Sequence, residues 1–252
     1  MTSPATPPND PRQPRDAAYW AEPVAALKVG AVPAGALNLN VDGRRVVGPL
    51  QGFCPLWQKT YRVRLAGSSA TPAEVILVWK ERFAALQPPH NRLYGMGAAA
   101  RPGEIVLMNA DMRCLPVNSG LLIPYADDEA FTLMTPEGCP EAGWIMCSAF
   151  VEDGATVAQI QTQGRSNDPI FEFGFRFLAG AKEQEKIWSH VLTELAALFG
   201  VRDAVNLRKV CLDPRIQWSR VGNVWGNATV RSVLYLMTHP GTLARRSTEC
   251  AG

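Results

Sequence analysis

Residues 61–83 read YRVRLAGSSATPAEVILVWKERF. The first five residues alternate apolar and charged side chains, which predicts a half-buried strand. A turn at 67–70 leads to TPAE, in which Thr71 can cap a helix, Pro72 suits the first helical position and Glu74 completes a capping box. This stretch therefore predicts a strand followed at once by a capped helix.

The predicted helix has one face suited to burial. Five of the six residues at helical spacing are apolar, the set being Val75, Val78, Trp79, Arg82, Phe83 and Leu86. Pro88 and Pro89 end the helix, because the residue before a proline disfavours the α conformation. A helix of this kind is expected to pack against another apolar surface.

After this helix the chain becomes strand-like. Short β-rich runs separated by turns occur at 104–112, 120–125, 131–135, 143–152 and 156–165. Strands joined so closely predict an antiparallel meander, because parallel strands need long crossover connections.

The segment after the last strand is compatible with two structures. Phenylalanines recur at every second position from Phe171 to Phe177, as in a strand, whereas Asp168 and Pro169 form a helix cap followed by a suitable first residue. We expect a short helix here.

A long helix is predicted over Lys182–Phe199. Its apolar residues recur on one stripe, acidic residues stand near its start, and Gly200 provides a stop. The predicted fold class is therefore α+β, with an antiparallel sheet and a long C-terminal helix.

The overall composition is that of an ordinary globular protein. The chain has 252 residues, 47% of them apolar and 19% charged, with a formal net charge of +2. This balance argues against a nucleic-acid partner, since such proteins carry a strong basic excess. No apolar run is long enough for a membrane span and no secretory leader is recognised, so we expect a cytoplasmic protein without stable membrane insertion.

The six cysteines are scattered, and no two have CxxC spacing. They are Cys54, Cys114, Cys139, Cys147, Cys211 and Cys250. This pattern predicts reduced thiols rather than a disulfide framework.

Four parts are expected along the chain. Residues 1–15 are proline-rich and predict a flexible tail, and residues 16–50 predict a loop-rich lead-in. The main domain is expected at 51–200, and residues 201–252 are expected to form a C-terminal extension packed on it.

The order of these elements resembles the START-like, or SRPBCC, superfamily, which has the helix-grip fold. The resemblance is carried by the TPAE helix start directly after strand Tyr61–Leu65, by Phe131–Gly138 followed by Gly143–Met146, and by the helix Lys182–Phe199 after the last strand. It covers about 52–200 and is one of arrangement. More narrowly, the chain is similar to an actinobacterial-type branch to which no activity attaches.

The resemblance implies a curved sheet that grips the long helix, with a cavity between them. Members of this superfamily carry lipids, sterols or polyketides, bind plant hormones, act as cyclases or dehydratases, or assist chaperones. One fold hosts all these functions, so the fold does not choose among them.

Large aromatic and methionine side chains fall on elements expected to face the interior. Such side chains line apolar cavities. The candidate ligand-binding residues are Trp79, Phe83, Met108, Met134, Trp144, Met146, Phe150, Phe171, Phe175 and Trp188. A row of polar residues at Gln159, Gln161, Gln163 and Arg165 is expected to face solvent, or else to form a hydrogen-bonding wall for an oxygenated ligand.

The sequence offers little other chemistry. The three histidines lack metal-ligand spacing, no nucleophile elbow is present, and the glycine-rich run 95–100 lacks the context of a dinucleotide site, so neither metal nor cofactor is expected. Only loose acid–base candidates exist, namely His90, Glu137 and Asp111.

The C-terminal extension carries two tryptophans seven residues apart, Trp218 and Trp225, which would share one helical face. Gly222 and Gly226 weaken a helix there. The segment could be an extra helix packed on the domain, a lid on the pocket, a homodimer contact or a membrane-surface patch.

Three functions remain open. The first is binding of a small, largely apolar, lipid- or polyketide-like molecule between sheet and long helix, which predicts an apolar cavity with one or two polar groups. The second is a cyclase or dehydratase using that cavity, which predicts an acid or base inside it. The third is an interaction protein, which predicts a filled core and exposed Trp218 and Trp225.

Overall fold

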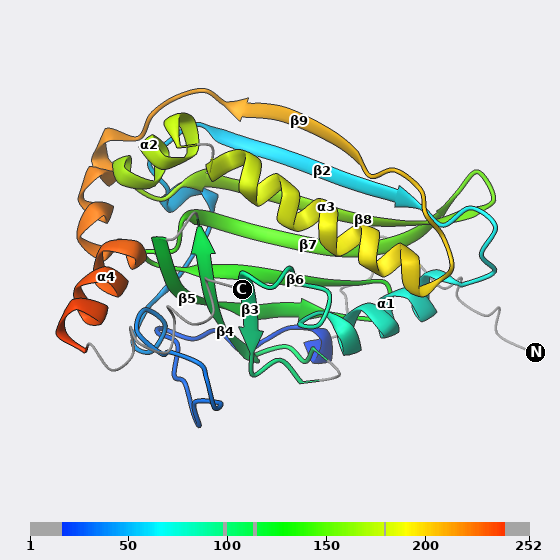
Figure 1. The fold of residues 1–252 in the computed structure, drawn as a ribbon, viewed down its shortest axis with the longest axis horizontal. Helices are drawn as coiled ribbons and strands as arrows, with labels where there is room; N and C mark the ends of the chain where they lie inside the picture. Colours follow the sequence, from blue (N-terminus) through cyan, green and yellow to red (C-terminus); the bar gives the residue numbers. More distant parts are fainter. Residues whose placement is uncertain (1–16, 98–99, 113–114, 179, 240–252) are drawn as a thin grey trace, which may run out of the picture.

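A computed structural model describes residues 17–97, 100–112, 115–178 and 180–239. The predicted tail at 1–15, Cys114 and Cys250 lie outside the described residues. Within the described ranges, nine strands form one antiparallel sheet that is accompanied by four α-helices (Figure 1).

The strands are β1 (Val46–Val47), β2 (Leu56–Arg64), β3 (Asn91–Tyr94), β4 (Ile105–Met112), β5 (Leu115–Ala126), β6 (Ala130–Pro136), β7 (Glu141–Glu152), β8 (Ala155–Ser166) and β9 (Asn206–Asp213). The α-helices are α1 (Pro72–Arg82), α2 (Pro169–Phe177), α3 (Gly180–Leu198) and α4 (Ala228–Thr238). The 3-10 helices are η1 (Ala17–Tyr19), η2 (Pro49–Gln51) and η3 (Trp218–Gly226).

The strand order is β3-β4-β5-β6-β7-β8-β2-β9, and β1 pairs with β6 outside this path. Consecutive strands from β3 to β8 are neighbours, so the predicted meander is confirmed. Strand β2 lies beyond β8 and brings the start of the domain against its last long strand.

Helices α1 and α3 cover one face of the sheet, called the inner face here. Helix α3 contacts β2 and β8, α1 contacts β7 and β8, and Figure 1 shows α3 lying lengthwise across the sheet. This is the α+β, helix-grip arrangement expected from the sequence. The opposite, outer face carries the alternate side chains of the same strands.

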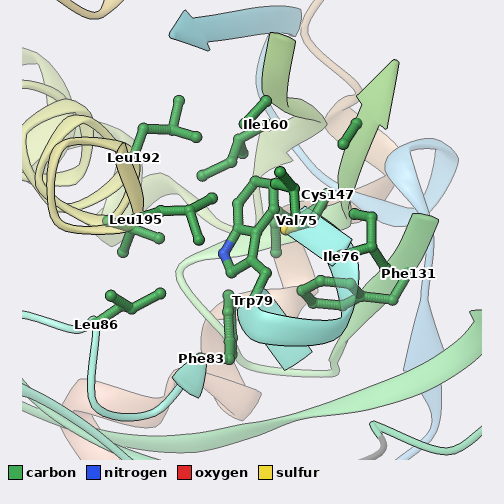
Figure 2. Packing of buried hydrophobic residues seen from close by; sticks show 14 of the residues in the cluster. Val75, Ile76, Trp79, Phe83, Leu86, Phe131, Cys147, Ile160, Leu192 and Leu195 are labelled. Carbon is green, nitrogen blue, oxygen red and sulfur yellow. The ribbon is translucent and has the colours of Figure 1, made fainter. Parts of the chain in front are cut away.

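The core lies between the inner face and these two helices. Trp79 of α1 and Phe83, the residue that follows α1, have no exposed surface, and both rings meet Phe131 of β6 edge-on, with centroids 5.8 and 5.4 Å apart. Figure 2 shows Trp79 enclosed between Ile160 of β8 and Leu195 of α3. Packed aromatic rings at such positions dominate core energetics.

The local signals at the starts of α1 and α2 are confirmed. The Thr71 hydroxyl accepts a hydrogen bond from the Glu74 backbone N–H at 3.3 Å, while the Glu74 carboxylate accepts from the Thr71 N–H at 2.8 Å. Asp168 caps α2, so the segment that could have been a strand is a helix. Its exposed face carries Phe173 and Phe177, while Phe171 is buried.

The extension after residue 200 contains a strand that the sequence analysis did not predict. Strand β9 pairs with β2 and forms an edge of the sheet. The following tryptophan segment is the 3-10 helix η3, consistent with its two glycines, and α4 completes the extension. The division of the chain into four parts remains a prediction.

No helix within the described ranges is long and apolar enough to cross a membrane.

Candidate functional site

The space between the inner face and α3 holds a cavity, which we call the inner cavity. Its volume is about 90 Å3, and its lining includes Met108, Ile145, Ile187 and Trp188. Small-molecule pockets usually measure roughly 300–1,000 Å3. The predicted cavity is therefore present, but packed side chains have reduced it to the size of a few water molecules.

A second hollow, which we call the α2 groove, adjoins the inner cavity. It measures about 320 Å3 and is lined mainly by apolar side chains of α2 and β5, including Leu115, Ile170, Phe171 and Phe173. Val117 and Phe175 line both hollows, so Phe175 stands between the inner cavity and the α2 groove.

Two residues fix the helices on either side of the α2 groove. The buried Asp168 carboxylate accepts backbone N–H groups of Ile170 and Phe171 at the start of α2, and its other oxygen accepts the Asn227 amide at 2.9 Å. Asn227 in turn accepts the Val230 N–H and caps α4. Burial raises the pKa of Asp168, and these hydrogen bonds oppose that rise. One buried pair thus joins the N-termini of α2 and α4.

Polar groups border the inner cavity on the α3 side. Gln184 donates its amide to the Glu141 carboxylate at 2.8 Å and accepts the Lys59 ammonium at 3.1 Å. The Trp188 indole N–H is buried and has no acceptor among the described residues. A buried donor without a partner is costly, and native structures leave few of them.

A third hollow, the outer-face groove, lies on the far side of the sheet. It measures about 790 Å3, with Trp20 of the lead-in and Tyr125 of β5 in its lining. These two rings contact each other with centroids 4.7 Å apart. Neither residue stands out in the sequence, because nothing near Trp20 indicates that the lead-in reaches β5.

The predicted ligand-binding residues do not line one cavity. Trp79 and Phe83 are core residues, while Met108, Phe175 and Trp188 line the inner cavity.

Phe171 lines the α2 groove together with Phe175. The remaining four residues lie in the outer-face groove, namely Met134, Trp144, Met146 and Phe150.

The register explains why this last group faces outward. Met134 pairs with Trp144, and Trp144 pairs with Gln163, so all three side chains share the outer face. The expectation that Trp144 shares a cavity with Trp188 is corrected by this pairing. The row Gln159, Gln161 and Gln163 lies on the outer face, but these side chains are buried or only partly exposed. Arg165 at the end of the row is 1% exposed, so it does not face solvent as expected.

The loose acid–base candidates do not line the inner cavity. His90 is exposed in the loop before β3, and Asp111 belongs to β4. Glu137 forms an ion pair with Arg45; burial raises its pKa, but the hydrogen bonds from Arg45 outweigh this and lower it. The carboxylate that does line the inner cavity, Glu141, was not singled out from the sequence.

The thiols are free in the described part of the chain. Cys54, Cys139 and Cys147 are buried and Cys211 is exposed. Burial raises the pKa of all three buried thiols, that of Cys139 to about 12. Since the thiolate is the nucleophile, these buried thiols are poorly suited to covalent catalysis.

Metal-binding geometry is absent from the described ranges, where no group of three or more His, Cys, Asp or Glu side chains could hold an ion.

The arrangement of one antiparallel sheet around α3 defines an α+β protein of the helix-grip class, with an apolar hollow beside its second helix. No protein-family profile and no curated protein matches the chain. Three of the solved structures to which it is similar are Ara h 8.0201, a di-domain aromatase/cyclase StfQ from the steffimycin biosynthetic pathway, and a START superfamily protein from Mycobacterium smegmatis.

The three likenesses are distant. Sequence identities are 9, 12 and 13%, and the TM-scores are 0.41, 0.44 and 0.38, respectively. Each match covers 57% of this chain, and 97, 50 and 97% of the other chain. They concern the fold alone, and no ligand or activity is transferred from them.

Proposed function

We propose that the protein binds a small, largely apolar molecule in the α2 groove, with part of the ligand entering the inner cavity past Phe175. The main support is the contact between the two hollows. The α2 groove lies by itself within the usual volume range of small-molecule sites, and it shares the lining residues Val117 and Phe175 with the inner cavity.

The lining of the α2 groove favours an apolar ligand. Phe171, Phe173 and Leu115 provide aromatic and aliphatic surface, and Glu183 is the charged residue at its border. Apolar surface removed from water contributes about 25 cal/mol per Å2 to binding.

The inner cavity supplies the polar contact that such a ligand needs. A carbonyl or hydroxyl oxygen on the ligand could accept the Trp188 indole N–H, and Gln184 lies in the same lining. A few such groups inside an apolar hollow orient a ligand and give specificity. The ligand class is therefore an apolar molecule with one oxygen-bearing end.

Titration with the fluorescent probe 1-anilinonaphthalene-8-sulfonate tests this site. Phe175→Trp adds volume between the two hollows and is expected to weaken probe binding about tenfold, whereas Phe175→Ala is expected to preserve or strengthen it. Circular dichroism of each variant reports whether it is folded. Native mass spectrometry of the purified protein is expected to detect a retained apolar molecule in the wild type and less of it in Phe175→Trp.

The matched control is Trp144→Ala, which alters the outer-face groove and leaves α2 untouched. Unchanged probe affinity in this variant supports the α2 groove. Loss of binding in Trp144→Ala with normal binding in Phe175→Trp would overturn the proposal and assign the probe to the outer face.

A further inference from the structure

The segment from residue 214 to residue 238 has an unusual charge pattern. It contains Arg215, Arg220 and Arg231 and no aspartate or glutamate, although the whole chain is nearly balanced in charge; Arg215 is ion-paired with Asp213 just before the segment. Two of the seven tryptophans also fall in it. A segment that combines arginine with tryptophan and lacks acidic residues is suited to an anionic surface with an apolar interior.

This segment exposes several apolar side chains. Trp218 and Trp225 of η3 are 69% and 87% exposed, and Val221 lies between them at 46%. Helix α4 exposes Leu234 and Met237. Figure 1 shows η3 and α4 following each other along one end of the molecule.

The Trp218 ring and helix η3 are held in place by the rest of the fold. Trp218 meets the buried Phe53 ring edge-on at 5.4 Å, and the Asn223 amide donates to the backbone carbonyls of Gln51 and Asn167, both at 2.8 Å. Gly138 also approaches η3 so closely that a Cβ there would lie 2.0 Å from a backbone oxygen. Exposed tryptophans on a helix fixed to the rest of the fold are characteristic of an interaction surface.

A cationic hollow, which we call the arginine hollow, lies beside η3. It measures about 510 Å3 and is lined by Arg44, Arg45 and Arg220, and Arg45 is ion-paired with Glu137, the one carboxylate among its described lining residues. Guanidinium groups bind phosphate oxygens in a bidentate manner. The hollow therefore has the chemistry to receive a phosphate-bearing lipid headgroup.

A second copy of the chain fits this surface less well. A two-fold contact would bring the arginines of η3 and α4 close to the same arginines of the other copy, and like charges at an interface are costly. Tryptophan, in contrast, is favoured at the boundary between headgroups and acyl chains.

We propose that η3 and α4 dock the protein peripherally on an anionic lipid bilayer, with Trp218 and Trp225 at the boundary between headgroups and acyl chains and the arginine hollow on a lipid phosphate. This surface borders the α2 groove at Thr229 of α4, but the docking proposal does not depend on the ligand proposed for that groove.

Vesicle sedimentation of the full chain tests the proposal. The protein is expected to bind phosphatidylcholine vesicles that contain phosphatidylglycerol, and to bind more weakly as salt is raised, because surface charges are screened. The double variant Trp218→Ala/Trp225→Ala is expected to lower the partition coefficient about tenfold or more, since both rings lose their apolar burial. Arg44→Gln/Arg220→Gln is expected to lower binding to the anionic vesicles.

The matched control is Leu77→Ala/Arg82→Gln on α1, which removes one exposed apolar and one exposed basic side chain elsewhere. It is expected to bind like the wild type, and circular dichroism reports the folding of all variants. Equal binding by the tryptophan variant and the control would overturn the proposal. So would a wild-type dimer in light scattering that the tryptophan variant converts to a monomer, with no vesicle binding.

Discussion

Replacing Arg165 with methionine is expected to destabilise the protein by about 3–5 kcal/mol, because a buried guanidinium loses its hydrogen bonds to two backbone carbonyls and one carboxylate. Arg165 is 1% exposed and ends strand β8. Its guanidinium donates to the carbonyls of Cys54 at 2.6 Å and Arg215 at 2.9 Å, and to the Asp213 carboxylate at 2.6 Å. It thus connects the residues just before β2, the sheet and the C-terminal extension.

The expected magnitude follows from these three contacts. Hydrogen bonds to charged groups contribute about 1.5–3 kcal/mol each. The Asp213 side chain is 20% exposed and keeps its contact with Arg215, so part of the loss is recovered by solvent and by that second partner. Methionine retains the apolar volume of the arginine stem, so the loss reports mainly on the polar contacts.

Equilibrium unfolding in urea, followed by circular dichroism, measures the free energy of unfolding. The matched control is Arg62→Met on the neighbouring strand β2, where Arg62 and its partner Glu152 are both 44% exposed. An exposed pair of this kind contributes about 0–1 kcal/mol. If Arg165→Met costs no more than Arg62→Met, the inference that Arg165 anchors the extension is refuted.

Two further predictions concern the same extension. Hydrogen bonds from Arg215, and then from Arg165, lower the pKa of Asp213, so the stabilising contribution of its carboxylate is present above about pH 4 and is lost as the pH falls through the lowered pKa. Asp213→Asn is therefore expected to reduce the dependence of unfolding on acid pH, measured in a pH series. An unchanged pH profile in this variant would contradict the prediction. Gly138 and Gly154 both have positive φ, at 86° and 74°, but a Cβ meets backbone only at Gly138. Gly138→Ala is expected to lower the thermal unfolding midpoint clearly more than Gly154→Ala, because the Gly154 variant carries only the left-handed backbone cost of roughly 1–2 kcal/mol. Equal midpoints in the two variants would show that η3 moves away from the added Cβ at little cost.

Local sequence signals predicted the elements that depend on neighbouring residues. The capping box at Thr71 and the cap at Asp168 act over three residues, so they could be recognised without the fold. Alternating residues and short turns likewise predicted the meander from β4 to β8.

Strand β9 was missed because its pattern carries no burial signal. None of its residues is buried, and its place beside β2 depends on pairing across more than 140 residues of sequence. Edge strands of this kind are defined by their partner rather than by an apolar period.

The sequence by itself determined the fold class, because hydrophobic period and capping are properties of adjacent residues. It could not determine which side chains meet in a site. Strand β7 is apolar in both phases, with Trp144 and Met146 alternating with Ile145 and Cys147, so its pattern does not say which set faces α3. Only the register of β6, β7 and β8, together with the packing of α1 and α3, decided that Trp144 faces outward and that the inner cavity is small. The sheet face that a side chain occupies and the volume of a cavity depend on contacts between residues that are distant in the chain, and a sequence pattern does not report those contacts.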